Sequence, residues 1–535
     1  MPAAAPFWAS TGADAAYLFL TGDAYLYLGI AEHSTADFFS FDGERPTNGF
    51  HPLWQYYLRL VAQFTGDNSI ALMNISALSG IACCWIGVIL LGMAVARGAG
   101  SWLLAGFVVP GVYFLLVGQG VGGNLAVWNF FNGMESGLAL ALTGAIALTA
   151  VHVQPDDRRV GFWLGLGVLT GLLMLCRLDE VFVSAAIGLT WLLWHPKRIV
   201  SRVWAVMLLG IPPALMLAGY FAYNLSYMDA LMPISGSAKG EGALVQNGWV
   251  TLANFFAPLI DIRETLTDYI GNHGAIGSAA FRVAQLLFPA LMALGFIVLL
   301  FTKFRETPWA PIVAGMCAAI VLKAGYNFVF VGYWHQASWY FSFAQGTISL
   351  VTALLVASLV GYWRTVAPLA VGLIVMLIVS VSFLQASKSY LARADRSHVS
   401  ERQMFYEAQA EIDAALEARF PTAKVMEFGD GMINFTLDRP VRHGFVFAGD
   451  IDSLTALQNG QLLQSAYEDG YRIMTSFEYY RWPSATLEKT SDEIRDRLLQ
   501  SGANYGIREE LGNFNFEVIY IYEPLNIPFI SFSPR

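Results

Sequence analysis

Long apolar runs recur along most of this chain and constrain its fold more than any other feature. They lie at about 69–95, 102–118, 134–152, 160–176, 178–194, 203–223, 283–301, 309–331, 340–360 and 366–386, and each is long enough to cross a bilayer as a helix. The sequence is 56% hydrophobic and only 13% charged, roughly half the charged fraction of a soluble chain. We therefore predict a polytopic α-helical membrane protein with about ten transmembrane helices.

The distribution of Lys and Arg predicts which side of the membrane each loop faces. Alternate short loops are basic, whereas the loops around 119–133 and 332–339 contain no Lys or Arg. The basic loops carry Arg97, Arg158, Arg159, Lys197, Arg198, Arg202, Lys303, Arg305 and Arg364. Because basic short loops stay in the cytoplasm, we expect the loops 23–68 and 224–282, the turn at 177 and the tail after about 387 to face outward.

The chain is expected to contain two domains. Residues 1–387 form the membrane domain, and 388–535 form an extracytoplasmic C-terminal α/β domain. The tail opens with an amphipathic helical pattern, and LTALQNGQLLQSAYEDG is also helical in pattern. Its strand-like runs are KVMEF, MINFTL, GFVFA, YRIMTSF, NYGIRE and FEVIYIY. The N-terminus has no signal-peptide pattern, and its expected external position leaves open whether a first helix is missing from this start site.

Charge and cysteine usage exclude two other classes of protein. The net charge of -9 offers no basic surface for nucleic acid. The four cysteines, Cys83, Cys84, Cys176 and Cys317, all lie in apolar runs, so we expect no disulfide framework. They are interpreted as small hydrophobic side chains.

The first predicted external loop contains the most informative string, GDAYLYLGIAEHSTADFFSFDGERPTNGFHPLWQYYLRL. Asp23 begins a helical run, and its carboxylate is a candidate general base; the alternatives are a helix N-cap or a loop carboxylate in water. His51 is a candidate contact to a donor phosphate, a metal ligand or a packed loop histidine. The segment after Pro52 is amphipathic and suits the membrane interface.

Two further stretches place ionisable residues at the ends of apolar runs. Glu135 in FNGMESGLALAL opens a helix, where it is either a carboxylate stabilised by the helix dipole or a ligand for sugar hydroxyls or a metal. CRLDEVF sets Arg177, Asp179 and Glu180 between two apolar helices. Ionisable groups there are functional by default, although turn charges can also reach water. The planar fork of Arg177 suits a phosphate or a sugar.

Two loops offer candidate substrate contacts. In LMPISGSAKGEG, backbone N–H groups of the Gly/Ser stretch together with Lys239 can hold an anion; the alternative is a solvated mobile loop. GYWHQASWYF carries Tyr333 and His335 in an aromatic-rich turn. This turn is either an aromatic belt at the membrane interface or a platform that stacks a sugar or a polyprenyl chain.

These strings resemble motifs of the GT-C glycosyltransferases, notably polyprenyl-phosphate-dependent arabinofuranosyltransferases and protein O-mannosyltransferase-like enzymes. That family carries an acidic pair before Ala-Tyr and a TN-x-x-PLW-like element, and TNGFHPLW stands here at 47–54. NGMES is similar to its NGMET-like element, the turn at 177–179 to its Arg-x-[DE] turns, and 233–239 to a P-x-SG-x-x-K element. In the tail, RPV stands at 439–441, but FVFAGD replaces the family's LDGL-like string.

The resemblance implies an inverting glycosyltransferase of the bacterial inner membrane, with a GT-C-like fold and Asp23 as general base. Its implied donor is a polyprenyl-phosphate-linked sugar, and its acceptor an envelope glycan, lipid or protein. The implied substrate-binding residues are His51, Glu135, Arg177, Asp179, Glu180, Lys239, Tyr333 and His335. Gly22 stands where the family's first acid is expected, so a divalent metal at Asp23 and Glu135 stays open, and no other cofactor is implied.

Two other classes of function compete with this interpretation. A transporter or flippase of a lipid-linked or anionic substrate would carry ionisable groups near the midplane of broken helices, whereas here they cluster at the outer ends. A non-catalytic envelope-assembly subunit with an external binding domain predicts that Asp23→Asn leaves activity intact. The sequence names neither the sugar nor the acceptor.

Overall fold

The structure is a computed structural model in which helices predominate. It describes residues 20–66, 68–118, 132–154, 159–194, 199–239, 303–330, 338–362, 406–429, 431–444, 446, 448–475, 493, 495–496, 507, 510–522 and 527–535. The chain divides into two compact units. Unit 1 comprises Met1–Ala77, Tyr220–Lys239 and Ala394–Arg535, and unit 2 comprises Leu78–Gly219 and Gly240–Arg393. The predicted domain boundary at residue 387 stays a prediction.

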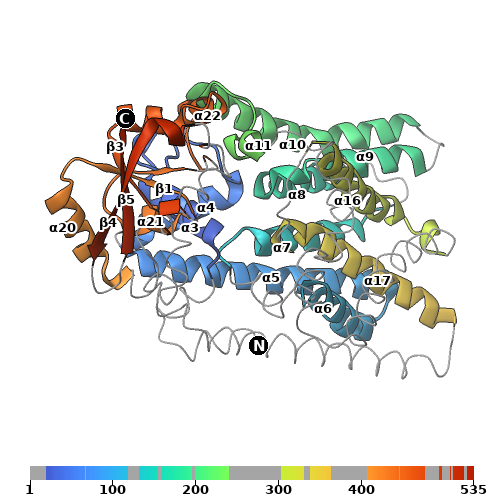
Figure 1. The fold of residues 1–535 in the computed structure, drawn as a ribbon. Helices are drawn as coiled ribbons and strands as arrows, with labels where there is room; N and C mark the ends of the chain where they lie inside the picture. Colours follow the sequence, from blue (N-terminus) through green and yellow to red (C-terminus); the bar gives the residue numbers. More distant parts are fainter. Residues whose placement is uncertain are drawn as a thin grey trace, which may run out of the picture. The chain divides into compact units, whose positions relative to one another are not determined.

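Eight of the predicted apolar runs form helices that are labelled in Figure 1. They are α5 (Ser69–Ala99), α6 (Trp102–Gly118), α7 (Ser136–Ala150), α8 (Val160–Cys176), α9 (Phe182–Trp194), α10 (Ile199–Met228), α16 (Ala310–Phe330) and α17 (Ser342–Tyr362). Short 3₁₀ turns lie at Leu178–Glu180 (η3), Lys303–Glu306 (η4) and Ser338–Phe341 (η5). In unit 2, α16 packs on α9, and α17 packs on α6 and α7. A Cβ atom on Gly315 would lie 2.5 Å from the Cα of Ile187, so only glycine permits this close approach of α16 to α9.

Two helices of the described chain are long and apolar enough to cross a membrane. They are α5, with 31 residues, and α10, with 30 residues. Other predicted runs form shorter described apolar helices, such as Ser136–Ala150 and Val160–Cys176. The predicted spans at 283–301 and 366–386 lie outside the described residues. The expectation of about ten transmembrane helices therefore stays a prediction, as does the inner-membrane location.

Unit 1 contains a mixed sheet of five strands. The strands are β1 (Lys424–Glu427), β2 (Val441–His443), β3 (Tyr471–Thr475), β4 (Phe514–Tyr522) and β5 (Ile527–Pro534), in the order β2-β1-β3-β5-β4. β1 runs parallel to β2 and β3, and β5 runs antiparallel to β3 and β4. Parallel neighbours need crossover connections. These contain α21 (Met432–Thr436) between β1 and β2, and α22 (Ile451–Gln458) and α23 (Leu462–Glu468) between β2 and β3.

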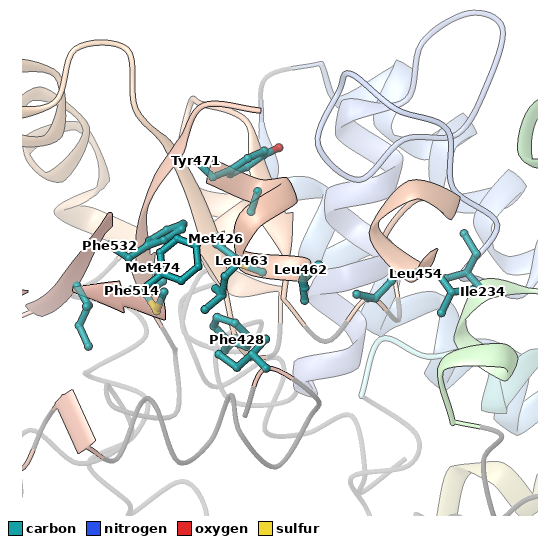
Figure 2. Close-up of a cluster of buried hydrophobic side chains, with 14 of the residues drawn as sticks. Ile234, Met426, Phe428, Leu454, Leu462, Leu463, Tyr471, Met474, Phe514 and Phe532 are labelled. Atoms are coloured by element: carbon teal, nitrogen blue, oxygen red, sulfur yellow. The ribbon is translucent and has the colours of Figure 1, made fainter. Parts of the chain in front are cut away.

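The core of this sheet also contains residues from far earlier in the chain. Side chains of the strands and of α22 and α23, including Met426, Leu454 and Tyr471, form one buried cluster with Ile234 (Figure 2). Ile234 begins the short helix α11 (Ile234–Lys239), and Met228 at the end of α10 belongs to the same cluster. A segment predicted to be an external loop therefore shares its hydrophobic core with the tail.

Several tail predictions are confirmed, and two are wrong. The strand predictions at KVMEF, YRIMTSF and FEVIYIY are confirmed by β1, β3 and β4, and the helical prediction at 454–470 by α22 and α23. The amphipathic pattern is helical at α20 (Gln409–Arg419), and NYGIRE lies largely outside the described residues. The strand prediction at GFVFA is wrong for its described residues, Gly444, Val446 and Ala448, because β2 ends at His443. The strand β5, which has a proline near each end, was not predicted.

The segment MINFTL was predicted as a strand but forms the helix α21. The buried carboxylate of Glu427 accepts hydrogen bonds from the backbone N–H groups of Ile433, at 3.3 Å, and Asn434, at 3.1 Å. Gly431 precedes the helix in the left-handed conformation, with φ of 78°. A tertiary contact from β1 thus overrides the local strand pattern, because it satisfies the first N–H groups of a helix.

Glycine contacts hold α21 against α3 (Gly22–His33), the helix that carries Asp23. A Cβ atom on Gly431 would lie 2.5 Å from Leu26 Cδ2, and one on Gly29 would lie 2.7 Å from Asn434 Nδ2. We expect Gly431→Ala to destabilise unit 1 by about 2–4 kcal/mol, because the clash adds to the cost of a left-handed alanine. Thermal unfolding of the purified protein measures this loss.

Gly470→Ala is the matched control for this prediction. Gly470 also has a positive φ, of 94°, but a Cβ atom there would meet nothing within 4 Å. The control should therefore show only the backbone cost, about 1–2 kcal/mol. Equal losses of stability in the two variants would show that the contact with Leu26 contributes nothing.

Candidate active site

Five charged side chains form one ion-pair cluster inside unit 2: Glu135, Arg177, Asp179, Glu180 and Lys323. Local structure explains their positions. Glu135 is the N-cap residue of α7, and Arg177 is the C-cap residue of α8; η3 carries Asp179 and Glu180, and Lys323 lies on α16. The predicted turn between two apolar helices is confirmed, because α8 ends at Cys176 and α9 begins at Phe182. The cluster thus joins four residues expected from the sequence with one that was not.

Arg177 is the centre of the cluster, and its side chain is 1% exposed. Its Nη1 group donates to Glu135 Oε1, which is wholly buried. Its Nε and Nη2 groups donate to the two carboxylate oxygens of Asp179, each at 3.2 Å. The guanidinium carbon also lies 4.8 Å from the ring centre of Tyr340, a cation–π distance. Arg177 is therefore fixed in orientation by two acids and an aromatic ring.

Lys323 is the member of the cluster that the sequence interpretation missed. Its Nζ lies 2.8 Å from Asp179 Oδ2 and 2.5 Å from Glu180 Oε1, and it donates to the carbonyl oxygen of Tyr340 at 3.0 Å. The signal that could have found it is a single lysine in the apolar run 309–331, since an ionisable group in such a run is functional by default.

The charges of the cluster nearly balance. Three carboxylates face two cations, so the formal charge is one negative unit, which fits the need of buried ions for partners. Asp179 differs from the rest because its side chain is 26% exposed, whereas the other four are at most 7% exposed. It bridges Arg177 and Lys323 at the most accessible point of the cluster.

Asp23 lies in unit 1, in the first turn of α3. Thr21 is the N-cap residue of this helix, so the alternative interpretation of Asp23 as the N-cap is wrong. Asp23 is half-buried, and the positive end of the helix dipole favours its negative charge. Tyr27 lies four residues further on and therefore on the same side of α3.

His51 is the N-cap residue of α4 (Pro52–Thr65) and packs on Tyr27. The ring centres of His51 and Tyr27 are 6.4 Å apart, with the rings 27° from parallel. The N–H group of His51 also donates to the hydroxyl oxygen of Tyr27 at 3.3 Å. Tyr27 thus brings His51 and Asp23 to one side of α3, and the substrate contact of His51 stays a prediction.

The TNGFHPLW element has a structural role that the sequence did not reveal. Asn48 is fully buried: its Nδ2 donates to the carbonyl of Met232 at 3.2 Å, and its Oδ1 accepts from the N–H of Ile234 at 2.9 Å. Thr47 donates its hydroxyl to the carbonyl of Gly449 at 2.6 Å. These two side chains join the first loop to the 232–234 segment and to the tail.

Ion pairs strengthen the attachment of the first loop to the tail. Arg45 lies 2.8 Å from Asp469 Oδ2, and the buried Arg442 lies 2.6 Å from the same oxygen. Partial burial pushes the pKa of Asp469 upward, but the hydrogen bonds and charges of these arginines outweigh it and bring the pKa below its usual value. Asp469 therefore stays ionised and holds both arginines.

The remaining candidates are only partly described. Lys239 ends α11, and its side chain, like the whole of Tyr333 and His335, lies outside the described residues. The N–H groups of Gly236 and Ser237 donate to the carbonyl of Pro233, at 3.0 and 3.2 Å, as the first hydrogen bonds of α11. The anion contact expected of this stretch and Lys239 stays a prediction.

The residues around Glu135 do not fit the metal site that the resemblance left open. The carboxylate of Glu135 pairs with the Arg177 guanidinium, a cation in the place of a metal ion. Across the described part of the chain, no three His, Cys, Asp or Glu side chains are grouped so as to hold a metal. We therefore derive no step through a metal at Glu135.

Comparisons with known proteins find similarity only among solved structures, because no family model and no curated protein matches the chain. ArnT from Cupriavidus metallidurans bound to undecaprenyl phosphate is 12% identical over 98% of both chains, with a TM-score of 0.49. The apo form of ArnT is 14% identical over 87% of this chain and 90% of that chain, with a TM-score of 0.45.

A second protein among these matches is the oligosaccharyltransferase AglB from Archaeoglobus fulgidus, in complex with an inhibitory peptide and a dolichol-phosphate. It is 11% identical over 97% of this chain and 71% of that chain, with a TM-score of 0.47. ArnT and AglB are GT-C glycosyltransferases. With TM-scores below 0.5, the likeness establishes neither the fold nor the activity of this chain.

Proposed function

We propose that this chain is an inverting GT-C-type glycosyltransferase of the bacterial inner membrane. It moves a sugar from a polyprenyl-phosphate donor to an envelope glycan, lipid or protein acceptor at the periplasmic face. Asp23 acts as the general base. The acceptor hydroxyl attacks the anomeric carbon as its proton passes to Asp23, and the bond from that carbon to the phosphate oxygen breaks. Polyprenyl phosphate leaves with the bonding electrons, and the anomeric carbon is inverted.

The observation that carries this proposal is the ion-pair cluster of unit 2. Glu135, Arg177, Asp179 and Glu180 were selected from two separate motif stretches, and their side chains share one buried cluster with Lys323. Burying five ionisable groups costs free energy, which their mutual ion pairs offset, and ionisable groups at the ends of membrane helices commonly mark a functional site.

Within this proposal, the donor phosphate takes the place of the Asp179 carboxylate between Arg177 and Lys323. A phosphate oxygen pair matches the two donors that Arg177 gives to Asp179, and Lys323 adds a point charge. Arg177 would keep its bond to Glu135, and Lys323 its bond to Glu180. Each cation therefore retains one partner when Asp179 moves away.

This arrangement predicts that Asp179→Asn lowers the KM for the donor. The variant leaves two carboxylates and two cations in the cluster. It also removes the carboxylate charge that competes with the donor phosphate for Arg177 and Lys323. We expect KM to fall on the order of tenfold with kcat little changed, because a charge-assisted hydrogen-bond pair is worth a few kcal/mol. Glu180→Gln is the control, since it removes the same charge from a carboxylate that is 2% exposed. A fall in KM in both variants, or in neither, would contradict the displacement.

The composition of unit 1 supports the side of the membrane assigned here. The loops 23–68 and 224–282 and the tail after about 387 were each predicted to face outward, and residues 23–68, 224–239 and 394–535 of them belong to unit 1. Met228 and Ile234 share one hydrophobic cluster with the tail, and the first loop is hydrogen-bonded to the tail through Thr47 and to Met232 through Asn48. Segments that pack together in one compact unit must lie on the same side of a membrane, as the basic-loop pattern requires.

The test of the function is transfer by the purified full chain in proteoliposomes. Radiolabelled sugars on polyprenyl phosphate form the donor panel, nucleotide sugars are the control donors, and an envelope extract supplies acceptors. We expect label to move from one lipid donor into acceptor and none to move from the nucleotide sugars. Movement of labelled donor across the bilayer without transfer would identify a flippase, and failure with every lipid donor would refute the proposal.

A further inference from the structure

The helix α4 exposes an apolar face to its surroundings. Trp54, Gln55, Leu58 and Val61 are buried on its inner side. On the outer side, Tyr56 is 56% exposed, Leu60 52% and Phe64 83%. These three residues are four apart and form one stripe along the helix, which is called the outer stripe of α4 below. Large apolar side chains gathered on one face mark an interaction surface rather than a face in water.

A second amphipathic helix of unit 1 shows what a water-facing helix looks like in this chain. The exposed residues of α20 include Glu411, Glu417 and Arg419. The helix α4, in contrast, has Arg59 as its single charged residue. The guanidinium of Arg59 lies 5.0 Å from the ring centre of Phe39 and donates to the carbonyl of Thr35, so it folds back on the protein. The outer stripe of α4 is therefore uncharged.

Covalent linkage ties α4 to one of the two helices that are long enough to cross a membrane. It ends at Thr65, and α5 begins at Ser69. Three intervening residues span at most about 10–14 Å. If α5 enters the membrane at its N-terminal end, the C-terminal end of α4 must therefore lie close to the membrane boundary.

Aromatic contacts tie α4 to the other such helix. The ring of Phe39 lies 4.9 Å from the ring of Tyr56 on α4 and 6.0 Å from that of Tyr223 on α10. The N–H of Phe39 donates to the hydroxyl oxygen of Tyr223 at 3.0 Å. In the same stretch, the end of α10 and the residues after it expose Leu225, Tyr227, Leu231 and Met232. Tyrosines beside exposed aliphatic side chains are typical of the membrane interface.

We propose that α4 lies in the outer interface of the phospholipid bilayer, with its outer stripe buried between headgroups and acyl chains. An interfacial helix of this kind sinks its apolar face about 5–10 Å into that boundary. The bilayer fits better than a second protein, because both helices of spanning length converge on α4 and the exposed apolar residues continue to the end of α10. This anchoring is independent of whether the chain transfers sugar, so either proposal can fail alone.

The test uses a fluorescent probe on the outer stripe of the full-length protein. Phe64→Cys and Tyr56→Cys variants are labelled with an environment-sensitive fluorophore and reconstituted in vesicles of phosphatidylethanolamine and phosphatidylglycerol. Lipids brominated either near the headgroup or near the chain end act as quenchers. We expect a blue-shifted probe, quenched on the order of twofold more by bromines near the headgroup than by bromines at the chain end. Wild-type protein treated with the label gives the background of the native cysteines.

Glu417→Cys on α20 is the matched control, because its side chain is 64% exposed on a helix of the same unit. Its probe should be unquenched by either lipid. The proposal is overturned if the probes at positions 56 and 64 behave like this control. It is also overturned if their spectra respond to dilution with unlabelled protein and not to brominated lipid, since the stripe would then be covered by a second copy. Because two positions are labelled, the same quenching at positions 56 and 64 shows that the result does not come from one variant that folds poorly.

Discussion

Asp23→Asn is expected to lower kcat for sugar transfer by roughly 10²–10⁴-fold while leaving the protein folded, because general-base catalysis contributes about that much. Asparagine has nearly the shape of aspartate, and Thr21 rather than Asp23 is the N-cap residue of α3, so the helix should keep its start. An amide cannot accept the proton of the acceptor hydroxyl. The loss should therefore appear in kcat, with the KM for the donor little changed.

Two controls make this result specific to the carboxylate of Asp23. Asp37→Asn removes an exposed acid from the same loop and should leave transfer unchanged. Asp23→Glu keeps the carboxylate but moves it by one methylene, and should retain part of the activity. If Asp23→Asn transfers sugar as fast as the wild type, the general base lies elsewhere. The non-catalytic assembly subunit would then be favoured.

Lys323→Met is expected to destabilise the protein by about 3–5 kcal/mol, which is the cost of breaking a buried ion pair from one side. Methionine fills a similar volume, so the effect comes from charge. Without the ammonium group, Asp179 and Glu180 lose a cation at 2.8 and 2.5 Å, and three acids face Arg177 alone. The melting temperature of the purified protein measures the loss. The same variant should also weaken donor binding, because one of the two proposed phosphate contacts is gone.

The same substitution at Lys424 provides the control for this prediction. Lys424 pairs with Glu44, but the two side chains are 25% and 42% exposed, so Lys424→Met should cost at most about 1 kcal/mol. The double variant Lys323→Met with Glu180→Gln should recover part of the stability lost in Lys323→Met, because it removes one of the unpaired carboxylates. If Lys323→Met and Lys424→Met lost equal stability, the ion pairs of the cluster in unit 2 would contribute no more than a surface ion pair.

The candidate site was found from the sequence only in part. Glu135, Arg177, Asp179 and Glu180 were recognised because each is an ionisable residue at the end of an apolar run, within a motif. Lys323 was missed because it belongs to no motif, and a lysine's partner can come from a distant helix that no local pattern reveals. The contacts of Asn48 with the 232–234 segment and of Thr47 with Gly449 were missed for the same reason.

The sequence by itself determined the apolar helices, the turn between α8 and α9 and the identity of most charged residues at their ends, because hydropathy and charge are local properties of the chain. Only the tertiary structure decided which carboxylate pairs with Arg177 and which with Lys323. It also made MINFTL a helix, since the buried Glu427 satisfies the N–H groups of Ile433 and Asn434. Finally, it united the end of α10, Ile234 and the tail in one core, and hydrogen-bonded the first loop to them through Thr47 and Asn48. Such choices depend on contacts between different elements of the fold, and a buried charge or N–H group is stable only beside the particular partner that the fold supplies.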